Sequence, residues 1–136
     1  MKRKYVDINE KGHLTFGGCD TVELAKEFGT PLYLVTEDGI RDKCRQVKEH
    51  FLNKYPNTLA LYASKAFSNI AMYKIIKEEG LGIDVVSSGE LYTAVKTGFP
   101  MEKVYFHGNN KTGEEIEFGI DHHVGCFVID SFHEME

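Results

Sequence analysis

The chain has 136 residues, 42% of them hydrophobic and 27% charged, which is the composition of one globular domain rather than of a disordered segment. Its formal net charge of -5 argues against nucleic acid as a partner, since phosphate binding needs a basic surface. No apolar stretch approaches the roughly 20 residues that span a bilayer, and the N-terminus lacks the apolar core of a signal peptide. We therefore expect no membrane partner. Three widely spaced cysteines predict neither a disulfide framework nor a metal site, so we expect a reducing, cytoplasmic compartment.

Short β elements dominate the first 35 residues. The expected elements are strands over 5–8, 13–16 and 31–35, and a helix over 21–28. Thr36, followed by two acidic residues, then begins a helix that is expected to continue to about Tyr55. Its apolar residues recur at helical spacing, so one face should be buried.

From residue 59 onward, an apolar run, a polar cap and a helical pattern repeat every twenty-odd residues. The apolar runs, expected as strands, cover 59–66, 82–88, 103–108 and 124–130. The expected helices cover 70–79, 91–97 and 116–122, with a fourth beginning at 131, and their caps are Ser68, Ser87, Thr112 and Ser131. Three of these caps have the Ser/Thr-x-x-Glu spacing of a capping box, in which two backbone donors are bonded reciprocally.

Successive strand–helix units predict βαβ crossovers and a parallel sheet. A doubly wound open sheet and a (β/α)8 barrel both fit this pattern. A full barrel takes about 250 residues and eight units, whereas this chain supplies four strands. Four parallel strands alone would leave two unprotected edges. We therefore expect the chain to be incomplete.

The strand expected over 59–66 carries Lys65 near its end, and alternation would place this lysine on the same face as Ala63. A solitary buried ammonium is heavily penalised, and the carboxyl ends of parallel strands are where ligands bind. A lysine there, beside a small alanine, suits Schiff-base chemistry because a desolvated amine is a good nucleophile. The residues alone leave open a lysine that simply extends into solvent.

Five segments of the chain resemble, in the same order, motifs of the type III (alanine-racemase-like) pyridoxal-phosphate (PLP) enzymes. Residues 62–66, Tyr-Ala-Ser-Lys-Ala, resemble the motif of the first barrel strand in that family. The other four resemble diaminopimelate decarboxylases: 29–33 before the barrel, then 82–91, 106–111 and 128–131 at its second, third and fourth strands. The resemblance covers the chain from about residue 27. Ser64 and Phe67 depart from it, standing where the family more often has Val and Asn.

The resemblance implies that residues 36–136 form the first half, about four βα units, of a PLP-binding (β/α)8 barrel. Residues 1–35 would be a β segment associated with the family's C-terminal β domain. It further implies PLP as cofactor, a homodimer, and an amino-acid substrate. The full-length protein would decarboxylate meso-2,6-diaminopimelate to L-lysine, the last step of lysine biosynthesis, and this chain alone would be inactive. The alternatives are another type III basic amino-acid decarboxylase or racemase, or a truncated, non-catalytic PLP-binding protein.

The resemblance also implies roles for particular residues. Lys65 would be catalytic, forming the internal aldimine with PLP until the substrate displaces it. Asp84 would supply a counter-charge to the released lysine, or else be a structural buried acid. His107 is expected to face the cofactor, with a packing role as its alternative. Glu90 either approaches the lysine or simply completes a capping box with Ser87.

Ala63 is the remaining candidate for contact with the cofactor. His122 and His123 are expected to end a helix, where the helix dipole favours them, without a catalytic role. The chain contains no Gly-rich phosphate loop, which barrels commonly build after strands 7 and 8. It also contains no later acid to pair with the pyridine nitrogen of PLP.

Overall fold

The structure is a computed structural model that describes residues 4–135. It comprises two compact units, Met1–Lys43 and Cys44–Glu136, and each unit is described by itself below. Within the described residues, no helix is both long and apolar enough to cross a membrane.

The N-terminal unit begins with a three-stranded antiparallel sheet in the order β1 (Val6–Ile8), β2 (Leu14–Phe16), β3 (Cys19–Asp20). The turn between β1 and β2 is closed by the side chain of Asn9, whose Oδ1 accepts hydrogen bonds from the amides of Lys11 and His13. Helix α1 (Thr21–Phe28) follows at once, as the sequence predicts.

The prediction of a strand over 31–35 is wrong. This segment is extended but belongs to no strand, because a strand requires a partner ladder and none of the described strands pairs with it. Pro31 also lacks the backbone N–H that a ladder needs. Its apolar side chains stay accessible instead, and Tyr33 is 96% exposed.

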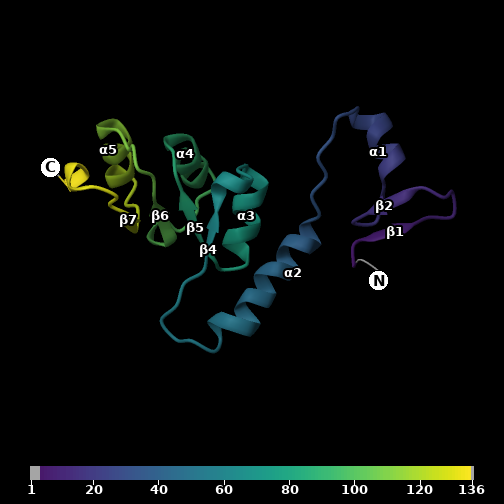
Figure 1. Ribbon diagram of the computed structural model, residues 1–136, viewed down its shortest axis with the longest axis horizontal. Coiled ribbons are helices and arrows are strands. Elements are labelled where there is room, and N and C mark those ends of the chain that lie inside the picture. The colour runs from purple at the N-terminus through teal and green to yellow at the C-terminus, as the bar shows by residue number, and fades with distance from the viewer. Residues whose placement is uncertain (1–3, 136) are drawn as a thin grey trace. The chain divides into compact units, whose positions relative to one another are not determined.

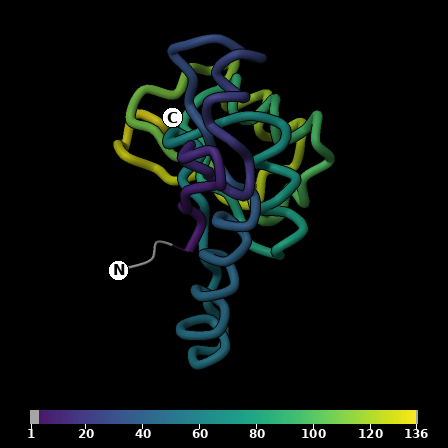
Figure 2. The backbone as a smooth tube through the Cα atoms, turned by 90° about the vertical axis from the view of Figure 1, so that its right-hand side faces the viewer, coloured from purple at the N-terminus to yellow at the C-terminus, as the bar shows by residue number. Residues whose placement is uncertain are grey.

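Helix α2 (Glu37–Val47) passes directly into a π-helical turn over Lys48–Leu52. The two form one continuous coil, seen in blue in the lower half of Figure 2. The helix expected to reach Tyr55 therefore ends three residues earlier, at Leu52. The amide of Asn53 closes this end by donating to the carbonyl of Lys48.

The C-terminal unit is a four-stranded parallel sheet with helices between its strands. The strands are β4 (Leu61–Ala63), β5 (Gly82–Val85), β6 (Val104–Phe106) and β7 (Cys126–Phe127), in that spatial order. The α-helices are α3 (Ile70–Glu78), α4 (Ser88–Lys96) and α5 (Gly113–Asp121). Short 3-10 turns are η2 (Ser64–Ala66), η3 (Met101–Lys103) and η4 (Phe132–Met135). The predicted parallel sheet and its strand–helix alternation are confirmed.

The strand pairing has a constant period. Leu61 lies opposite Gly82, Ile83 opposite Val104, and Tyr105 opposite Cys126. In each pair the two residue numbers differ by 21, so each strand lies beside the one made 21 residues earlier. This regular register brings the carboxyl ends of all four strands to one edge of the sheet.

The two faces of the sheet differ in burial. Helices α3, α4 and α5 lie on one side of the strands (Figure 1). On that side Ile83, Val85 and Phe106 are fully buried, as alternation along β5 and β6 requires. Residues of the opposite face, such as Asp84 and Tyr105, remain partly exposed. In a (β/α)8 barrel the helix-free face is the interior, so the sheet fits the first part of such a barrel.

The helix caps follow the sequence in part. The complete capping box lies at α5, where Thr112 and Glu115 bond each other's backbone amides. Helix α3 is capped by Asn69 rather than by Ser68, and Asn69 Oδ1 accepts from the amide of Met72 at 2.8 Å. The Ser68 hydroxyl instead donates a hydrogen bond to the side chain of Tyr73.

Candidate active site

The carboxyl ends of β4, β5 and β6 carry the residues predicted to act. Strand register places Ala63 beside Asp84, and Asp84 beside Tyr105. The three side chains therefore lie in a row on the helix-free face. The methyl group of Ala63 is the smallest of the three side chains. A contact between Ala63 and a cofactor stays a prediction.

Asp84 and His107 are brought together, as expected of two residues that serve one site. His107 follows β6 and extends the ladder, because its amide donates to the carbonyl of Val85 at 2.8 Å. Its Nδ1 lies 4.0 Å from Asp84 Oδ2. The side chains are 47% and 24% exposed respectively, so both can be reached from the open face. Asp84 is partly rather than fully buried, and the roles of both residues stay predictions.

Lys65 does not lie on the strand that the sequence predicts for it. Strand β4 ends at Ala63, and Lys65 is the central residue of the 3-10 turn η2. The alternation argument therefore stops before Lys65, and the side chain is exposed rather than desolvated by the described residues. None of the described residues bonds its amine. The consequence is a free primary amine two residues beyond the end of β4.

The Glu90 carboxylate bonds several neighbours, but not in the arrangement of a capping box. Ser87 caps α4 and accepts from the Glu90 amide, but the Glu90 carboxylate does not return to the Ser87 amide. Glu90 Oε2 instead accepts from the amide of Val86 at 2.7 Å and from the Ser87 hydroxyl at 2.9 Å. Its other oxygen, Oε1, lies 3.0 Å from the hydroxyl of Ser64, beside Lys65. The expected capping box is wrong here, and the buried carboxylate reaches toward the turn that carries Lys65.

Ser64 is a residue whose importance the sequence analysis missed. It is fully buried, and its hydroxyl lies 2.7 Å from the carbonyl oxygen of Asp84. A neighbouring buried phenol, Tyr73, accepts a hydrogen bond from Ser68 at 3.2 Å. Burial raises the pKa of Tyr73 and outweighs the lowering by hydrogen bonds from Ser64 and Ser68. The signal in the sequence was the departure of Ser64 from the valine more usual in the family.

Lys111 and Glu134 form a second group that the sequence analysis did not assign. Their side chains are only 2% and 8% exposed, and Lys111 Nζ lies 3.1 Å from Glu134 Oε2. Lys111 also donates to the carbonyls of Gly108 and Val128, so it links the loops that follow β6 and β7. Glu134 Oε2 accepts from the amide of Asp130, and this bond together with Lys111 lowers the pKa of Glu134.

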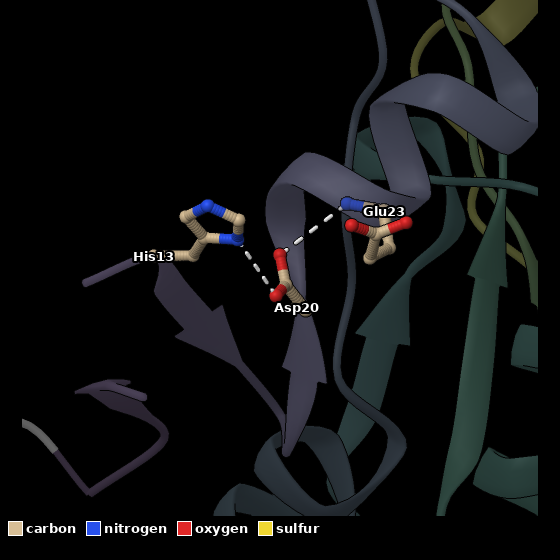
Figure 3. A group of neighbouring side chains, drawn as sticks. All are labelled: His13, Asp20 and Glu23. Atoms are coloured by element: carbon tan, nitrogen blue, oxygen red, sulfur yellow. Dashed lines mark hydrogen bonds and ion pairs between the residues drawn. The ribbon is translucent and has the colours of Figure 1, made fainter. Parts of the chain in front are cut away.

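In the N-terminal unit, His13, Asp20 and Glu23 lie close enough to suggest a metal site (Figure 3). Their hydrogen bonds give another explanation. Asp20 Oδ2 accepts from Asn9 and faces His13 Nδ1 at 2.9 Å, while Asp20 Oδ1 accepts from the amides of Val22 and Glu23 as the cap of α1. Burial raises the pKa of Asp20, but these bonds together lower it well below its usual range. Both oxygens are thus already used in joining the sheet to the helix.

The groups at the strand ends suit a carbonyl cofactor. A free primary amine can condense with an aldehyde, and a carboxylate and an imidazole can orient or exchange protons nearby. Lys65, Asp84 and His107 supply these three groups from the ends of successive strands.

Comparisons with known proteins agree with this chemistry. Residues 37–136 match the family model described as the pyridoxal-binding domain of the pyridoxal-dependent decarboxylases. The chain is 51% identical over 129 residues to the diaminopimelate decarboxylase of Bacillus methanolicus, covering 95% of this chain and 30% of that protein. It is 48% identical over 127 residues to that of Bacillus subtilis, covering 93% of this chain and 29% of that protein.

A solved structure shares the fold. The diaminopimelate decarboxylase of M. jannaschii, in complex with L-lysine, superposes with a TM-score of 0.88 at 38% identity. The match covers 97% of this chain and 31% of that one. The chain thus spans about 30% of the length of the relatives it matches. The resemblance proposed from the five sequence motifs, and the barrel fold that it implies, are confirmed.

Proposed function

Because the chain belongs to the pyridoxal-dependent decarboxylases, we propose that it forms the N-terminal part of an enzyme that converts meso-2,6-diaminopimelate to L-lysine. This longer protein is called the complete decarboxylase below. The proposal rests on one observation: Lys65, Asp84 and His107 lie at the ends of neighbouring strands, within the segment that matches the family. The names of the relatives and the lysine bound to the M. jannaschii enzyme support the choice of substrate.

Lys65 would hold pyridoxal phosphate through its amine. The amine is exposed and lies on a short, hydrogen-bonded turn, so it can reach a cofactor that occupies the helix-free side of the sheet. When bound, the cofactor supplies an electron sink for the carbanion that loss of carbon dioxide creates. The role of the chain is then to anchor the cofactor and to orient it against the substrate.

Asp84 and His107 would act on the same side as the cofactor. A carboxylate at the neighbouring strand end would stabilise the cationic form of the Lys65 amine whenever the substrate displaces it. His107 would pack against the cofactor or donate to it, and the small Ala63 would leave room for the ring. All three assignments are proposals that the resemblance suggested and the strand register supports.

The remaining parts of the proposal concern the complete decarboxylase. Residues 1–35 would associate with a C-terminal β domain, and residues 36–136 would form the first half of the barrel. We further propose a homodimer in the cytoplasm, a compartment that suits the three free cysteines.

The test is to map the cofactor chemically. Borohydride reduction of the complete decarboxylase, followed by peptide mass mapping, should place the pyridoxyl group on Lys65. Lys65→Ala should abolish this labelling and lower lysine formation by orders of magnitude, because both anchoring and product release need the amine. Lys74→Ala, which removes an exposed lysine of α3, is the matched control and should change neither. Labelling at Lys74 or any other lysine would refute the assignment, and turnover of a different basic amino acid would favour the alternative decarboxylase.

A further inference from the structure

We propose that Ser64 is a positioning residue whose hydroxyl fixes the turn that carries Lys65 to strand β5 and to Glu90. This inference rests on the proposed function, because it concerns where the Lys65 amine can reach. The contrast between neighbours suggests it: Ser64 is fully buried, whereas Lys65 is exposed. The turn therefore has a buried base and an exposed reactive end.

The Ser64 hydroxyl meets two acceptors on different elements. Its Oγ lies 2.7 Å from the main-chain oxygen of Asp84 and 3.0 Å from Glu90 Oε1. A serine hydroxyl carries one proton, so these two acceptors compete for it with the nearby Tyr73 phenol, whose pKa burial raises and a hydrogen bond from Ser64 lowers. The contact with Asp84 attaches η2 to β5, and the contact with Glu90 attaches it to α4. The Lys65 turn and the backbone of Asp84 are thereby held in one arrangement.

Glu90 is itself held in place, so the attachment is firm. Its second oxygen accepts from the Val86 amide at 2.7 Å and the Ser87 hydroxyl at 2.9 Å. The carboxylate is therefore bonded at both oxygens inside the unit, where it is 9% exposed. It acts on Lys65 through Ser64, without needing to touch the cofactor.

The far side of the turn is fixed as well. The Tyr62 hydroxyl donates to the carbonyl of Phe67 at 3.0 Å, and the Ser68 hydroxyl donates to Tyr73 at 3.2 Å. Within the turn, the Phe67 amide donates to the Ser64 carbonyl at 3.1 Å. Ser64 supplies the contacts that join this loop to the strand bearing Asp84.

The test compares Ser64→Ala with wild type in the complete decarboxylase. In the cofactor-free protein, the Phe67 amide should exchange with deuterium about tenfold faster, since the lost hydrogen bond is made to a charged group. The Lys65 amine should be acylated at a different rate at one fixed pH, because the turn that carries it is held less firmly. In the loaded enzyme, kcat should fall about tenfold with KM little changed. Thr93→Ala is the matched control, because it removes a hydroxyl that bonds only within α4, and it should leave all three readouts unchanged.

Two further variants keep the proposal falsifiable. Ser64→Cys keeps a donor, though a weaker one, on a slightly larger side chain, so it should give intermediate values even if Ser64→Ala folds poorly. In a Glu90→Gln background, Ser64→Ala should have a smaller effect than in wild type, because the two residues act together. Wild-type exchange, acylation and kinetics in both Ser64 variants would overturn the inference while leaving Lys65 as the mapped anchor. A pyridoxyl label found away from Lys65 would overturn the proposed function and this inference together.

Discussion

Replacing Asp84 by Asn keeps the shape of the side chain and removes its charge, so it separates a structural role from a functional one. The Asp84 carboxylate lies 4.0 Å from His107. At that distance a carboxylate and a protonated imidazole interact by about 1 kcal/mol in water and about 4 kcal/mol at an effective dielectric constant of 20, and a neutral imidazole interacts by less. Because the side chains are 24% and 47% exposed, solvent screening places the pair near the lower value. We therefore expect Asp84→Asn to change the free energy of unfolding by less than about 1 kcal/mol.

The catalytic effect should be larger than the structural one. A charge that stabilises the reacting groups typically contributes about a hundredfold to kcat, which corresponds to about 2.7 kcal/mol. The assay is lysine formation by the complete decarboxylase, measured beside its urea denaturation midpoint and its bound cofactor. Unchanged turnover at normal stability would refute the counter-charge role. Marked destabilisation with normal specific activity would show that Asp84 is structural.

Three other predictions follow from the packing and the caps. Gly125→Ala should lower the free energy of unfolding by about 1–3 kcal/mol, because the new methyl group would overlap the backbone of Glu102. Thermal melting should show this loss. Gly113→Ala is the control, because its methyl group would meet open space. The pKa of Glu115 is lowered, chiefly by the hydrogen bond from the Thr112 amide. The Glu115 carboxylate therefore stabilises the fold at pH values above about 4.5, its unfolded pKa, and this stabilisation is lost as the pH falls below that value. Glu115→Gln should flatten that part of a stability-against-pH curve, and a curve of unchanged steepness would contradict the assignment. The 136-residue chain made alone should aggregate and form no lysine, because its helix-free sheet face and strand edges are open; a monodisperse monomer with activity, seen by sedimentation and assay, would disprove this.

The sequence predicted the elements that have strong local signals. The helix over 21–28 was predicted to the residue, and in the structure Asp20 and Gly29 cap its two ends. The four parallel strands were also predicted, although each is shorter than its apolar run. The run over 31–35 misled, because its composition suits a strand but its backbone finds no partner.

Long-range contacts limited the prediction of the site. The position of Lys65 was misjudged because the apolar run continues through a 3-10 turn, and the pattern of apolar residues does not mark where β4 ends. The capping-box spacing at Ser87 correctly predicted a helix start, but local spacing could not reveal that Glu90 bonds Ser64, 26 residues away. The distance between Asp84 and His107 likewise depends on strand register, which sequence periodicity implies only loosely.

The constant 21-residue period of the sheet has a consequence for how the protein is made. Each strand pairs with the one synthesised just before it. When a strand leaves the ribosome, its partner strand has therefore already been released. Translation at about 5–20 residues per second would add one such unit every few seconds. This interval is far longer than the microseconds to milliseconds in which local structure forms. The sheet can therefore grow in the direction of translation, with Lys65 and its turn in place before His107 has been synthesised.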